Sequence, residues 1–595
     1  MTVNERIAAL RQAMRKYGID AFLVPSSDPH QSEYVADHWK SREWLSGFTG
    51  SAGTLIVTTD HAGLWTDSRY FLQAEQQLAG SEVELHKQQT PHAPEHVQWL
   101  ADQLDAGSSV GCDGFLFSVR QIRHLEKHLR PHGIELHYDL ELIGDIWEER
   151  PPLPDDEIFE FDIRYAGKSR KEKLERIRER VHAREADQYL VTTLDDIAWT
   201  LNLRGHDVEY NPVFISYLVL RDSNALLFLD PDKVPDELAV LLAEDGVELR
   251  PYASILPYLE SLEEDVDVLI DPASTNIRLF DAIPEEQRME GENIPRKLKA
   301  IKNETEIDHI RRVMVKDGVA LLKLYRWLEA ILQSRSVTEF EVARQLDHFR
   351  RAQGNYHGES FSAIVGYKAN GAIVHYRPDP ETSASLQRDG LLLLDSGGQY
   401  EEGTTDITRT TALGESTEEQ RRDYTLVLKG HIALATIQFP EGSSGAQLDP
   451  LARMHLWREG LNYGHGTGHG VGFFLNVHEP PQGFAGMAGG RGSTPLQPGM
   501  LTSNEPGFYK DGEYGIRIEN LVLCVKGPET DYGKFLKFET LTLFPIDLDL
   551  IETELLTKAE KQWLNSYHER VFEALSPYLN PEELGWLEQK CQPVG

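Results

Sequence analysis

Cysteine is scarce in this sequence, with three residues among 595. Cys112, Cys524 and Cys591 lie far apart and form no CxxC pair. A disulfide framework and a cysteine-based zinc or redox site are therefore excluded, because both need paired or closely spaced thiols. Isolated thiols of this kind are typical of a reducing compartment, so we expect a cytoplasmic protein.

Long hydrophobic runs are missing too. Aliphatic runs such as 238–243 and 391–394 are far shorter than the roughly 20 apolar residues that a membrane-spanning helix needs. The first 20 residues carry charges throughout, and their apolar residues recur at helical spacing: Ile7, Leu10, Met14 and Tyr17. This pattern predicts an amphipathic helix of the folded protein rather than a signal peptide, and we expect no membrane partner.

Two well-known signatures are also absent. No GxSxG occurs in the chain, so a serine hydrolase built on a nucleophile elbow has no support. The glycine-rich stretch 464–472 has His469 where a dinucleotide fingerprint requires its third glycine. Dinucleotide binding therefore has no support either.

Positive charge is in deficit. The chain has 60 Lys and Arg against 96 Asp and Glu, which gives a net charge of −36 spread along its length. Such a field repels phosphate backbones and attracts cations, so we expect no nucleic-acid partner. With 40% hydrophobic and 26% charged residues, the composition is otherwise that of an ordinary globular protein.

The chain is too long for a single hydrophobic core, so several domains are expected. The acidic, proline-rich stretch 151–156 is typical of a linker. The segment after it repeats features of the first, since residues 187–191 echo residues 20–24. These observations predict two related α/β domains, followed by a third unit that begins near Arg296.

The third unit is expected to begin and end with helices. Asn303 and Glu306 have the spacing of a capping pair before a long helix that runs to about residue 332. Near the end of the chain, apolar residues again recur at helical spacing: Trp563, Tyr567, Val571, Leu575 and Tyr578. We interpret this stripe as packing.

Acidic residues occur on strands that are otherwise apolar or β-branched. Asp395 ends the apolar run 391–395, and Asp406 lies in the β-branched run 404–410. A turn centred near Tyr400 and Glu401 would place the two acids directly opposite each other, with Cβ atoms ~4.5–5.5 Å apart. Two like charges at that distance destabilise a sheet unless a cation lies between them.

The same arrangement recurs further along the chain. Glu505 follows the run 501–504, Glu519 ends the run 515–519, and an Asp-Gly turn signal lies between them. A turn centred on Gly512 makes the two glutamates opposite partners. His469 adds a nitrogen ligand, and the glycines around it are expected to let the backbone approach a substrate or ion closely.

Four carboxylates and one imidazole make an oxygen-rich site. Such sites suit Mn²⁺, Co²⁺, Mg²⁺ or paired Zn²⁺. Two divalent ions balance four carboxylates better than one ion does. Two metals ~3.5–4 Å apart are a known device for activating a bridging water and polarising a carbonyl.

These residues resemble the five metal ligands of the pita-bread metallopeptidases, a family that includes methionine aminopeptidase, prolidase and aminopeptidase P. The surrounding segments are similar, more narrowly, to the long, three-domain cytosolic aminopeptidase P. The matching segments are 371–376, 395–400, 465–472, 476–479 and 515–520, together with 28–34, 47–53, 65–71 and 563–568. The resemblance covers essentially the whole chain, and no ligand position departs from it.

The resemblance implies an α/β (α+β) architecture. Two related creatinase-like N-terminal α/β domains would span residues 1–155 and 156–297, and a pita-bread catalytic domain with a C-terminal helical extension would span residues 298–595. It also implies two divalent ions per subunit, Mn²⁺ by preference, with Co²⁺ or Zn²⁺ as alternatives. The implied metal ligands are Asp395, Asp406, His469, Glu505 and Glu519.

The resemblance also assigns roles. Asp395 would hold one ion and His469 the other, Asp406 and Glu519 would bridge them, and Glu505 would bind metal and act as general base. The catalytic and substrate-binding residues would further include His375, His465, His478 and Arg69.

His375 and His478 would steady the tetrahedral intermediate and shuttle protons, and His465 would line the substrate pocket. Arg69 would reach the substrate site from the first domain, with a structural ion pair as its alternative. For Arg517, both ligand orientation and an ordinary strand ion pair remain open.

The implied reaction is release of the N-terminal residue from peptides with proline second, by a homodimer. The apolar residues 471–474 could wall the proline ring. Prolidase, which clamps the free C-terminus of a dipeptide at the same metal centre, is the alternative enzyme. The duplicated N-terminal half favours aminopeptidase P, and the complete ligand set disfavours metal-free creatinase chemistry and peptide-binding modules without metal.

Overall fold

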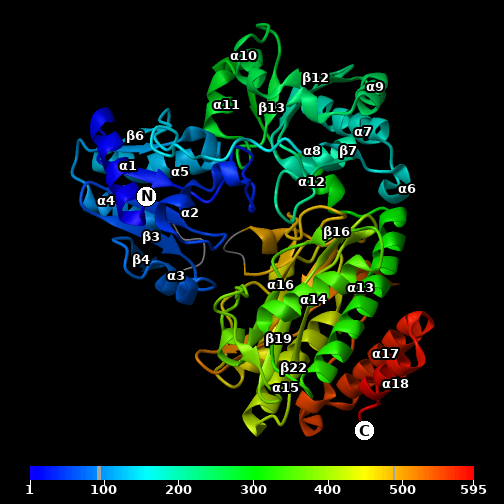
Figure 1. Ribbon diagram of the computed structural model, residues 1–595. Coiled ribbons are helices and arrows are strands. Elements are labelled where there is room, and N and C mark those ends of the chain that lie inside the picture. Colours follow the sequence, from blue (N-terminus) through cyan, green and yellow to red (C-terminus); the bar gives the residue numbers. More distant parts are fainter. Residues whose placement is uncertain (90–94, 487–489) are drawn as a thin grey trace. The chain divides into compact units, whose positions relative to one another are not determined.

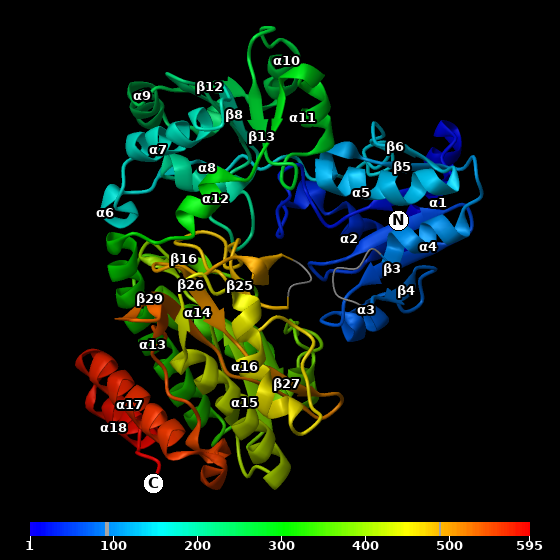
Figure 2. The same cartoon turned by 180° about the vertical axis from the view of Figure 1, so that it is seen from behind.

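The computed structural model describes residues 1–89, 95–486 and 490–595. The chain divides into two compact units, Met1–Leu298 and Lys299–Gly595 (Figures 1 and 2). The first unit contains two separate six-stranded sheets with helices, and the second contains several smaller sheets with long helices. The mixed α/β class is thus confirmed, while the domain boundaries at residues 155 and 297 stay predictions.

The first sheet has the strand order β4-β3-β2-β1-β5-β6. Its strands are β1 Ala21–Val24, β2 Thr54–Thr58, β3 Ala62–Thr66, β4 Glu84–Lys87, β5 Ser109–Cys112 and β6 Glu135–His137. Strands β1, β2 and β3 pair antiparallel, whereas β4, β5 and β6 join in parallel. The accompanying helices are α1 Val3–Tyr17, α2 Ser41–Ser46, α3 Phe71–Gln77, α4 Glu95–Gln103 and α5 Val119–Leu129.

The second sheet repeats this plan with the order β12-β11-β10-β8-β13-β14. Its strands are β8 Gln188–Val191, β10 Tyr217–Leu220, β11 Ala225–Leu229, β12 Val247–Pro251, β13 Val268–Ile270 and β14 Arg288–Glu290. The parallel and antiparallel pairings match the first sheet strand for strand. The duplication predicted from residues 20–24 and 187–191 is therefore confirmed, because these segments become the equivalent central strands β1 and β8.

Helices of the second sheet and a small strand pair complete the first unit. The helices are α6 Ile163–Ala166, α7 Arg170–His182, α8 Leu194–Leu201, α9 Asp236–Glu244, α10 Ile255–Glu260, α11 Ile277–Ala282 and α12 Ile294–Lys299. Strands β7 Phe159–Glu160 and β9 Leu203–Arg204 pair antiparallel.

The predicted N-terminal helix is present as α1. Ile7, Leu10 and Met14 are fully buried and pack into the core of the first sheet. Tyr17 is 46% exposed, contrary to the prediction, because the helix ends there and Gly18 turns the chain with φ 69°. Within the part of the chain that the structure describes, no helix is both long and apolar enough to cross a membrane.

The second unit is built on several small sheets. One three-stranded sheet has the strand order β17-β19-β22, with β17 Ile364–Tyr367, β19 Leu391–Ser396 and β22 Ile407–Ala412. A four-stranded sheet has the strand order β23-β30-β29-β26, with β23 Gln438–Pro440, β30 Gly533–Thr540, β29 Asn520–Thr530 and β26 Leu501–Asn504. Shorter pieces are β15 Val337–Thr338 with β18 Ser385–Leu386, and β16 Tyr356–Glu359 with β20 Gly398–Tyr400 and β21 Gly403–Thr404. Two further pairs are β24 Gly468–His469 with β25 Gly483–Phe484, and β27 Gly507–Lys510 with β28 Tyr514–Arg517.

Long helices accompany these sheets. They are α13 Glu304–Ile331, α14 Glu339–Arg351, α15 Glu418–Thr436, α16 Gly445–Trp457, α17 Lys558–Leu575 and α18 Pro581–Lys590. The predicted capping box of Asn303 and Glu306 is confirmed at the start of α13. Figures 1 and 2 both show α17 and α18 side by side at one end of the unit.

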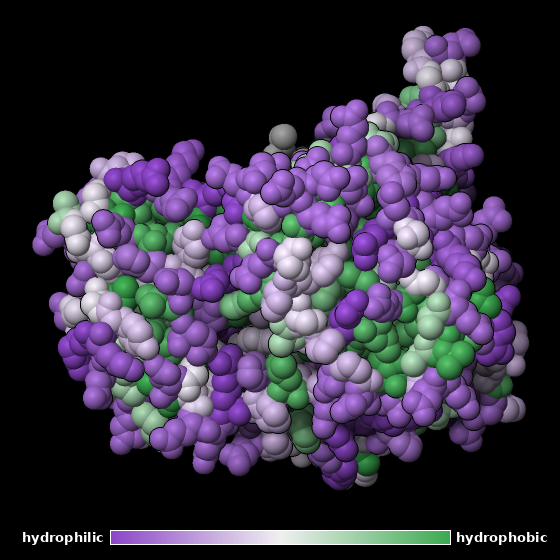
Figure 3. All heavy atoms as spheres, turned by 90° about the horizontal axis from the view of Figure 1, so that it is seen from above, coloured by the Kyte–Doolittle hydropathy of each residue, from purple (hydrophilic) through white to green (hydrophobic). Residues whose placement is uncertain are grey.

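The C-terminal stripe is mostly packing, as predicted. Tyr567, Val571 and Leu575 are buried, and the Tyr567 hydroxyl contacts the buried Arg409 at 2.9 Å. Tyr578 is 64% exposed because it lies beyond the end of α17. On the face shown in Figure 3, hydrophilic side chains predominate and hydrophobic ones form small areas between them.

Candidate metal centre

The first predicted pair of opposed acids has a different register from the one expected. Asp395, in β19, lies opposite Thr408 rather than opposite Asp406, a shift of two residues. The reason is the turn, since Tyr400 pairs with Gly403 and the chain reverses at residues 401–402. Asp406 falls in the break between β21 and β22, where it leaves the ladder. The two carboxylates still interact, because burial raises the pKa of Asp395 and the charge of Asp406 adds to that rise.

The second pair has the predicted register. Asn504 lies opposite Asn520 in one ladder and Gly507 opposite Arg517 in the next, and both pairings place Glu505 across from Glu519. Both glutamates lie in the gap between these ladders, outside the strands. Their amides are held by other segments, since Glu505 N donates to Thr467 O at 2.8 Å and Glu519 N donates to Thr408 O at 3.1 Å.

His469 brings these two regions together. Its Nε2 atom lies 3.4 Å from Oδ2 of Asp406 and 3.5 Å from Oε1 of Glu505. Possible ligand atoms of Asp406, His469 and Glu519 all lie within 4.8 Å of one another. Three chain segments distant in sequence therefore meet at one cluster of carboxylates and imidazole.

Hydrogen bonds hold these carboxylates in place. Arg517 donates to Oδ2 of Asp395 at 2.6 Å, and the Thr408 hydroxyl donates to Glu519 at 2.8 Å. The ion-pair alternative for Arg517 is therefore present, and its partner is a predicted ligand. The Ser503 hydroxyl accepts from the His469 amide at 2.9 Å and donates to Glu505 at 3.1 Å.

Most of the cluster residues have shifted pKa values, because the site is largely buried and several negative charges lie close together in it. Burial raises the pKa of Asp395 to about 6 and that of Glu505 to about 7, although Arg517 and His469 act in the opposite sense. Burial and the neighbouring carboxylates raise the pKa of Glu519 well above its ordinary value. Burial lowers the pKa of His469, but its hydrogen bond to Asp406 and nearby negative charge outweigh burial and raise the pKa to about 9.

The donor set fits divalent metal ions. Oδ1 of Asp395 is buried, and no hydrogen-bond partner for it exists among residues 1–89, 95–486 and 490–595. A buried carboxylate oxygen without a partner is costly unless a cation takes that place. Carboxylates with one imidazole suit Mn²⁺, Co²⁺, Mg²⁺ or Zn²⁺.

One of the predicted histidines contacts this cluster directly, and the other two are linked to it through neighbouring residues. The His478 ring lies 4.3 Å from the His469 ring in an edge-on arrangement. His465 Nε2 is 2.8 Å from the hydroxyl of Tyr509, which accepts from Arg517 at 2.6 Å. His375 follows Val374, whose carbonyl lies 3.5 Å from Arg517.

Tyr509 is a residue that our sequence reasoning missed. Its hydroxyl joins Arg517, the partner of Asp395, to His465. The predicted hairpin register could have identified it, because Gly507 faces Arg517 and Tyr509 lies two residues further along the same strand. Residues two apart on a strand share a face, so Tyr509 is a diagonal neighbour of Arg517.

Two glycines that flank His469 lie against other backbone segments of the chain. A Cβ atom on Gly468 would lie 1.9 Å from Ser503 O, and one on Gly470 would lie 2.2 Å from Glu479 O. Gly468 and Gly470 thus let the chain's own backbones pack closely, and the close approach to a substrate or ion stays a prediction. Val471, Phe473 and Phe474 are at most 2% exposed and belong to the packed interior.

Arg69 lies in the first unit. Its guanidinium donates to both carboxylate oxygens of Asp67, at 2.8 Å and 2.7 Å, and its side chain is 25% exposed. The structural ion pair that we weighed as the alternative is therefore present. The substrate role of Arg69 stays a prediction.

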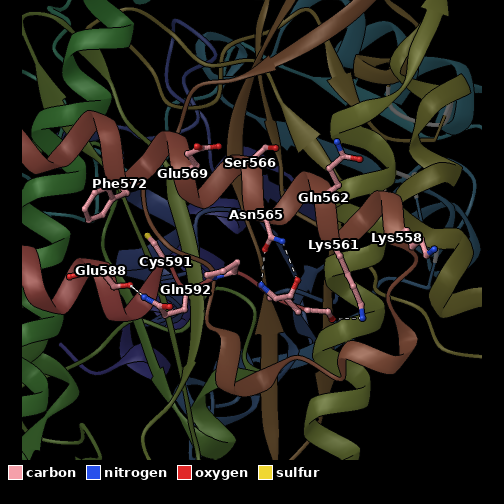
Figure 4. Close-up of a pocket in the computed structure, with 13 residues that line it drawn as sticks. Lys558, Lys561, Gln562, Asn565, Ser566, Glu569, Phe572, Glu588, Cys591 and Gln592 are labelled. Carbon is pink, nitrogen blue, oxygen red and sulfur yellow. Dashed lines mark hydrogen bonds between the residues drawn. The ribbon is translucent and has the colours of Figure 1, made fainter.

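A cavity of about 680 Å³ lies elsewhere, between α17 and the end of the chain (Figure 4). Lys561 donates to Gly595 O at 2.6 Å, and Asn565 exchanges hydrogen bonds with the Val594 backbone. None of the predicted site residues lines this cavity, so it has no part in the metal centre.

Family models match segments that together cover most of the chain. Residues 308–526 match the Metallopeptidase family M24, and residues 534–594 match the C-terminal region of the same peptidases. Residues 6–137 and 149–306 each match the Creatinase/Prolidase N-terminal domain.

Full-length relatives are similar as well. A probable Xaa-Pro aminopeptidase P of Laccaria bicolor is 42% identical over all of this chain and 94% of its own length. Aminopeptidase P2 of Arabidopsis thaliana is 40% identical over all of this chain and 89% of its own length.

Among solved structures, the X-prolyl aminopeptidase of Caenorhabditis elegans superposes with a TM-score of 0.95 and 35% identity, over the whole of both chains. That protein is described as a cytosolic enzyme with a di-nuclear active site. The chain therefore belongs to the Xaa-Pro aminopeptidase P branch of metallopeptidase family M24, and it is a metallo-aminopeptidase.

Proposed function

We propose that this protein hydrolyses the first peptide bond of peptides with proline at the second position, at a centre of two divalent ions. The observation that carries the proposal is the largely buried cluster of four carboxylates and His469, in which Oδ1 of Asp395 has no protein partner among the described residues. Asp395, Asp406, His469, Glu505 and Glu519 would hold the ions. When bound, two such ions supply an activated bridging water and polarise the scissile carbonyl.

Side chains of the protein would supply proton transfer, stabilisation of the intermediate and positioning of a metal ligand. Glu505 would take the proton of the attacking water as general base. His478, beside His469, and His375 would steady the tetrahedral intermediate and move protons to the leaving amine. Arg517 would keep Asp395 in place through their 2.6 Å contact.

The proposed substrate follows from the relatives and from the chemistry of proline. Relatives and the solved neighbour carry names that specify Xaa-Pro or X-prolyl substrates. An X–Pro bond has no N–H and a fixed ring, so most aminopeptidases cannot use it. His465 and His478 would flank the ring, and the negative site would hold the free α-ammonium group.

Peptide assays test this specificity. We expect cleavage of Arg-Pro-Pro with release of the first residue only, and roughly 10- to 100-fold lower kcat/KM for Arg-Ala-Ala, because the proline ring contributes binding that alanine lacks. Acetylation of the substrate's N-terminus should remove activity. Equal rates on the proline, alanine and acetylated peptides would reduce the protein to an unspecialised peptidase of this fold, and a preference for Gly-Pro would identify a prolidase.

Arg69 is proposed to bind substrate from the first unit. Replacing it by glutamine should raise KM roughly 10- to 100-fold while kcat changes less, because a charge-assisted contact to substrate is worth about 1.5–3 kcal/mol. Asp67→Asn is the matched variant, since it breaks the same ion pair but leaves the guanidinium. Similar kinetics for wild type and Arg69→Gln would leave only the structural ion pair.

We further propose Mn²⁺ as the working ion, with Co²⁺ or Zn²⁺ as substitutes, a homodimer as the working assembly and a cytoplasmic location. Ligand hardness supports Mn²⁺. The isolated cysteines and the cytosolic description of the solved neighbour support the location. Sedimentation analysis tests the assembly, and a monomer at assay concentration would refute it.

A further inference from the structure

A second cluster of metal-ligating side chains lies in the first unit, at the edge of its first sheet. His61 directly precedes β3, and Glu84 and His86 lie on the edge strand β4 (Figure 1). Possible ligand atoms of these three residues all lie within 4.8 Å of one another. None of the proposed catalytic residues belongs to this cluster.

The distance between the two imidazoles is the informative feature. Nε2 of His61 lies 3.1 Å from Nε2 of His86. Two nitrogens bound to one tetrahedral zinc ion lie roughly 3.3 Å apart, given Zn–N bonds of about 2.0–2.1 Å. A shared hydrogen bond is the competing explanation, and it requires one ring to donate and the other to accept.

The strands are built so that these rings can meet. In the parallel pairing of β3 with β4, Gly63 lies opposite Glu84 and Trp65 opposite His86. A Cβ atom on Gly63 would lie 2.8 Å from Nε2 of His61 and 2.8 Å from Cδ2 of His86. The missing side chain at Gly63 therefore leaves the space in which the two imidazoles face each other.

Aromatic rings fix the orientation of the imidazoles. His86 stacks on Trp65 at 3.9 Å and 16°, and the His61 ring lies 5.0 Å from Trp99 of α4. The backbone of His61 is held as well, since its amide donates to the Thr58 hydroxyl at 3.0 Å. A ligand pair held in this way loses little entropy when it binds an ion.

The third ligand is exposed and free to adjust. Oε1 of Glu84 lies 4.0 Å from Nδ1 of His61, the nitrogen that does not face His86. The Glu84 side chain, which is 72% exposed, would therefore rotate to reach an ion held by the two Nε2 atoms. Two imidazoles and one carboxylate favour borderline transition-metal ions over Ca²⁺ or Mg²⁺.

We propose that His61, His86 and Glu84 form a binding site for a transition-metal dication of the Zn²⁺, Ni²⁺ or Cu²⁺ class, separate from the catalytic centre. The site has two fixed nitrogen ligands and one adjustable carboxylate. It does not depend on the proposed peptidase function.

The chain offers a matched control at the opposite edge of the same sheet. Strand β6 carries Glu135 and His137 with the same i, i+2 spacing, and Nε2 of His137 lies 3.8 Å from Oε2 of Glu135. Among the described residues, this pair belongs to no group of three possible ligands. It therefore has the exposed histidine and acid of the proposed site without the second imidazole.

The test is zinc content after equilibrium dialysis of the full-length protein. Wild type and His137→Gln should each retain about one more zinc ion per chain than His61→Gln and His86→Gln, whatever the catalytic centre holds. Peptidase activity of the manganese-loaded protein should be the same in all four. Equal zinc content in all four would overturn the proposal.

A second measurement needs no variant, in case the substitutions disturb the sheet. Wild-type crystals soaked in zinc should show an anomalous-scattering peak between the Nε2 atoms of His61 and His86. Absence of that peak at a concentration that fills the carboxylate centre would show that the two rings share only a hydrogen bond.

Discussion

Replacing Glu505 by glutamine is expected to lower kcat by roughly 10²- to 10⁴-fold, the usual contribution of a general base. The amide has the size of the carboxylate but cannot accept the proton of the attacking water. Its position should survive, because the backbone contact of Glu505 N with Thr467 O at 2.8 Å does not involve the side chain. Steady-state kinetics on Arg-Pro-Pro give the measurement.

Glu513→Gln is the control for this experiment. Glu513 lies in the turn of the neighbouring hairpin, where its 53% exposed side chain pairs with Lys510 at 3.1 Å. This variant should keep full activity. Metal content and melting temperature of Glu505→Gln separate lost chemistry from lost ions or fold. Near-normal kcat in Glu505→Gln would show that the base lies elsewhere.

Removal of the metal ions is expected to abolish activity and destabilise the second unit. Without cations, four carboxylates crowd one buried site, three of them with raised pKa values. Dialysis against a chelator, followed by elemental analysis and a peptide assay, tests this. About two equivalents of Mn²⁺ per chain should restore both activity and melting temperature.

The pH dependence of the metal-free protein provides a sharper form of the same test. Burial raises the pKa of Asp395 to about 6 and of Glu505 to about 7, against roughly 4 in the unfolded chain. Their protonation therefore contributes stability that is full below about pH 4 and is lost as pH rises through 6 to 7. Bound ions would keep these groups ionised.

The melting-temperature gap between loaded and metal-free protein should therefore widen from pH 5.5 to pH 8. A melting-temperature difference that stays constant over this range would show that the ions do not offset the repulsion among the ionised carboxylates. Activity that survives complete removal of metal would refute the metal centre itself.

The duplicated sheets and the second acid pair were predictable from local sequence. The equivalent central strands β1 and β8 are short apolar runs with recognisable neighbours in the chain. In the hairpin of β27 and β28, Gly512 adopts φ 71° in the turn, so an Asp-Gly signal was enough to set the register. That register places Glu505 across from Glu519.

The first acid pair was harder to predict because its turn has no such signal. The chain reverses at residues 401–402, and this turn alone places Asp395 opposite Thr408. The strand is also broken at Asp406, between β21 and β22. Breaks of this kind depend on neighbouring segments. Here the Ser360 hydroxyl donates to Thr405 O at 2.9 Å, a contact between residues 45 positions apart.

By itself, the amino-acid sequence determined the fold class, the duplication and the family, and it singled out the acidic and histidine residues of the candidate centre, since each depends on local patterns or on motifs. Only the tertiary structure decided which atoms meet. The contact of Arg517 with Asp395, the link through Tyr509 to His465 and the facing imidazoles of His61 and His86 join segments that local propensity cannot bring together. Such contacts arise from the packing of whole strands and loops, where one missing side chain, as at Gly63, decides whether two rings can face each other.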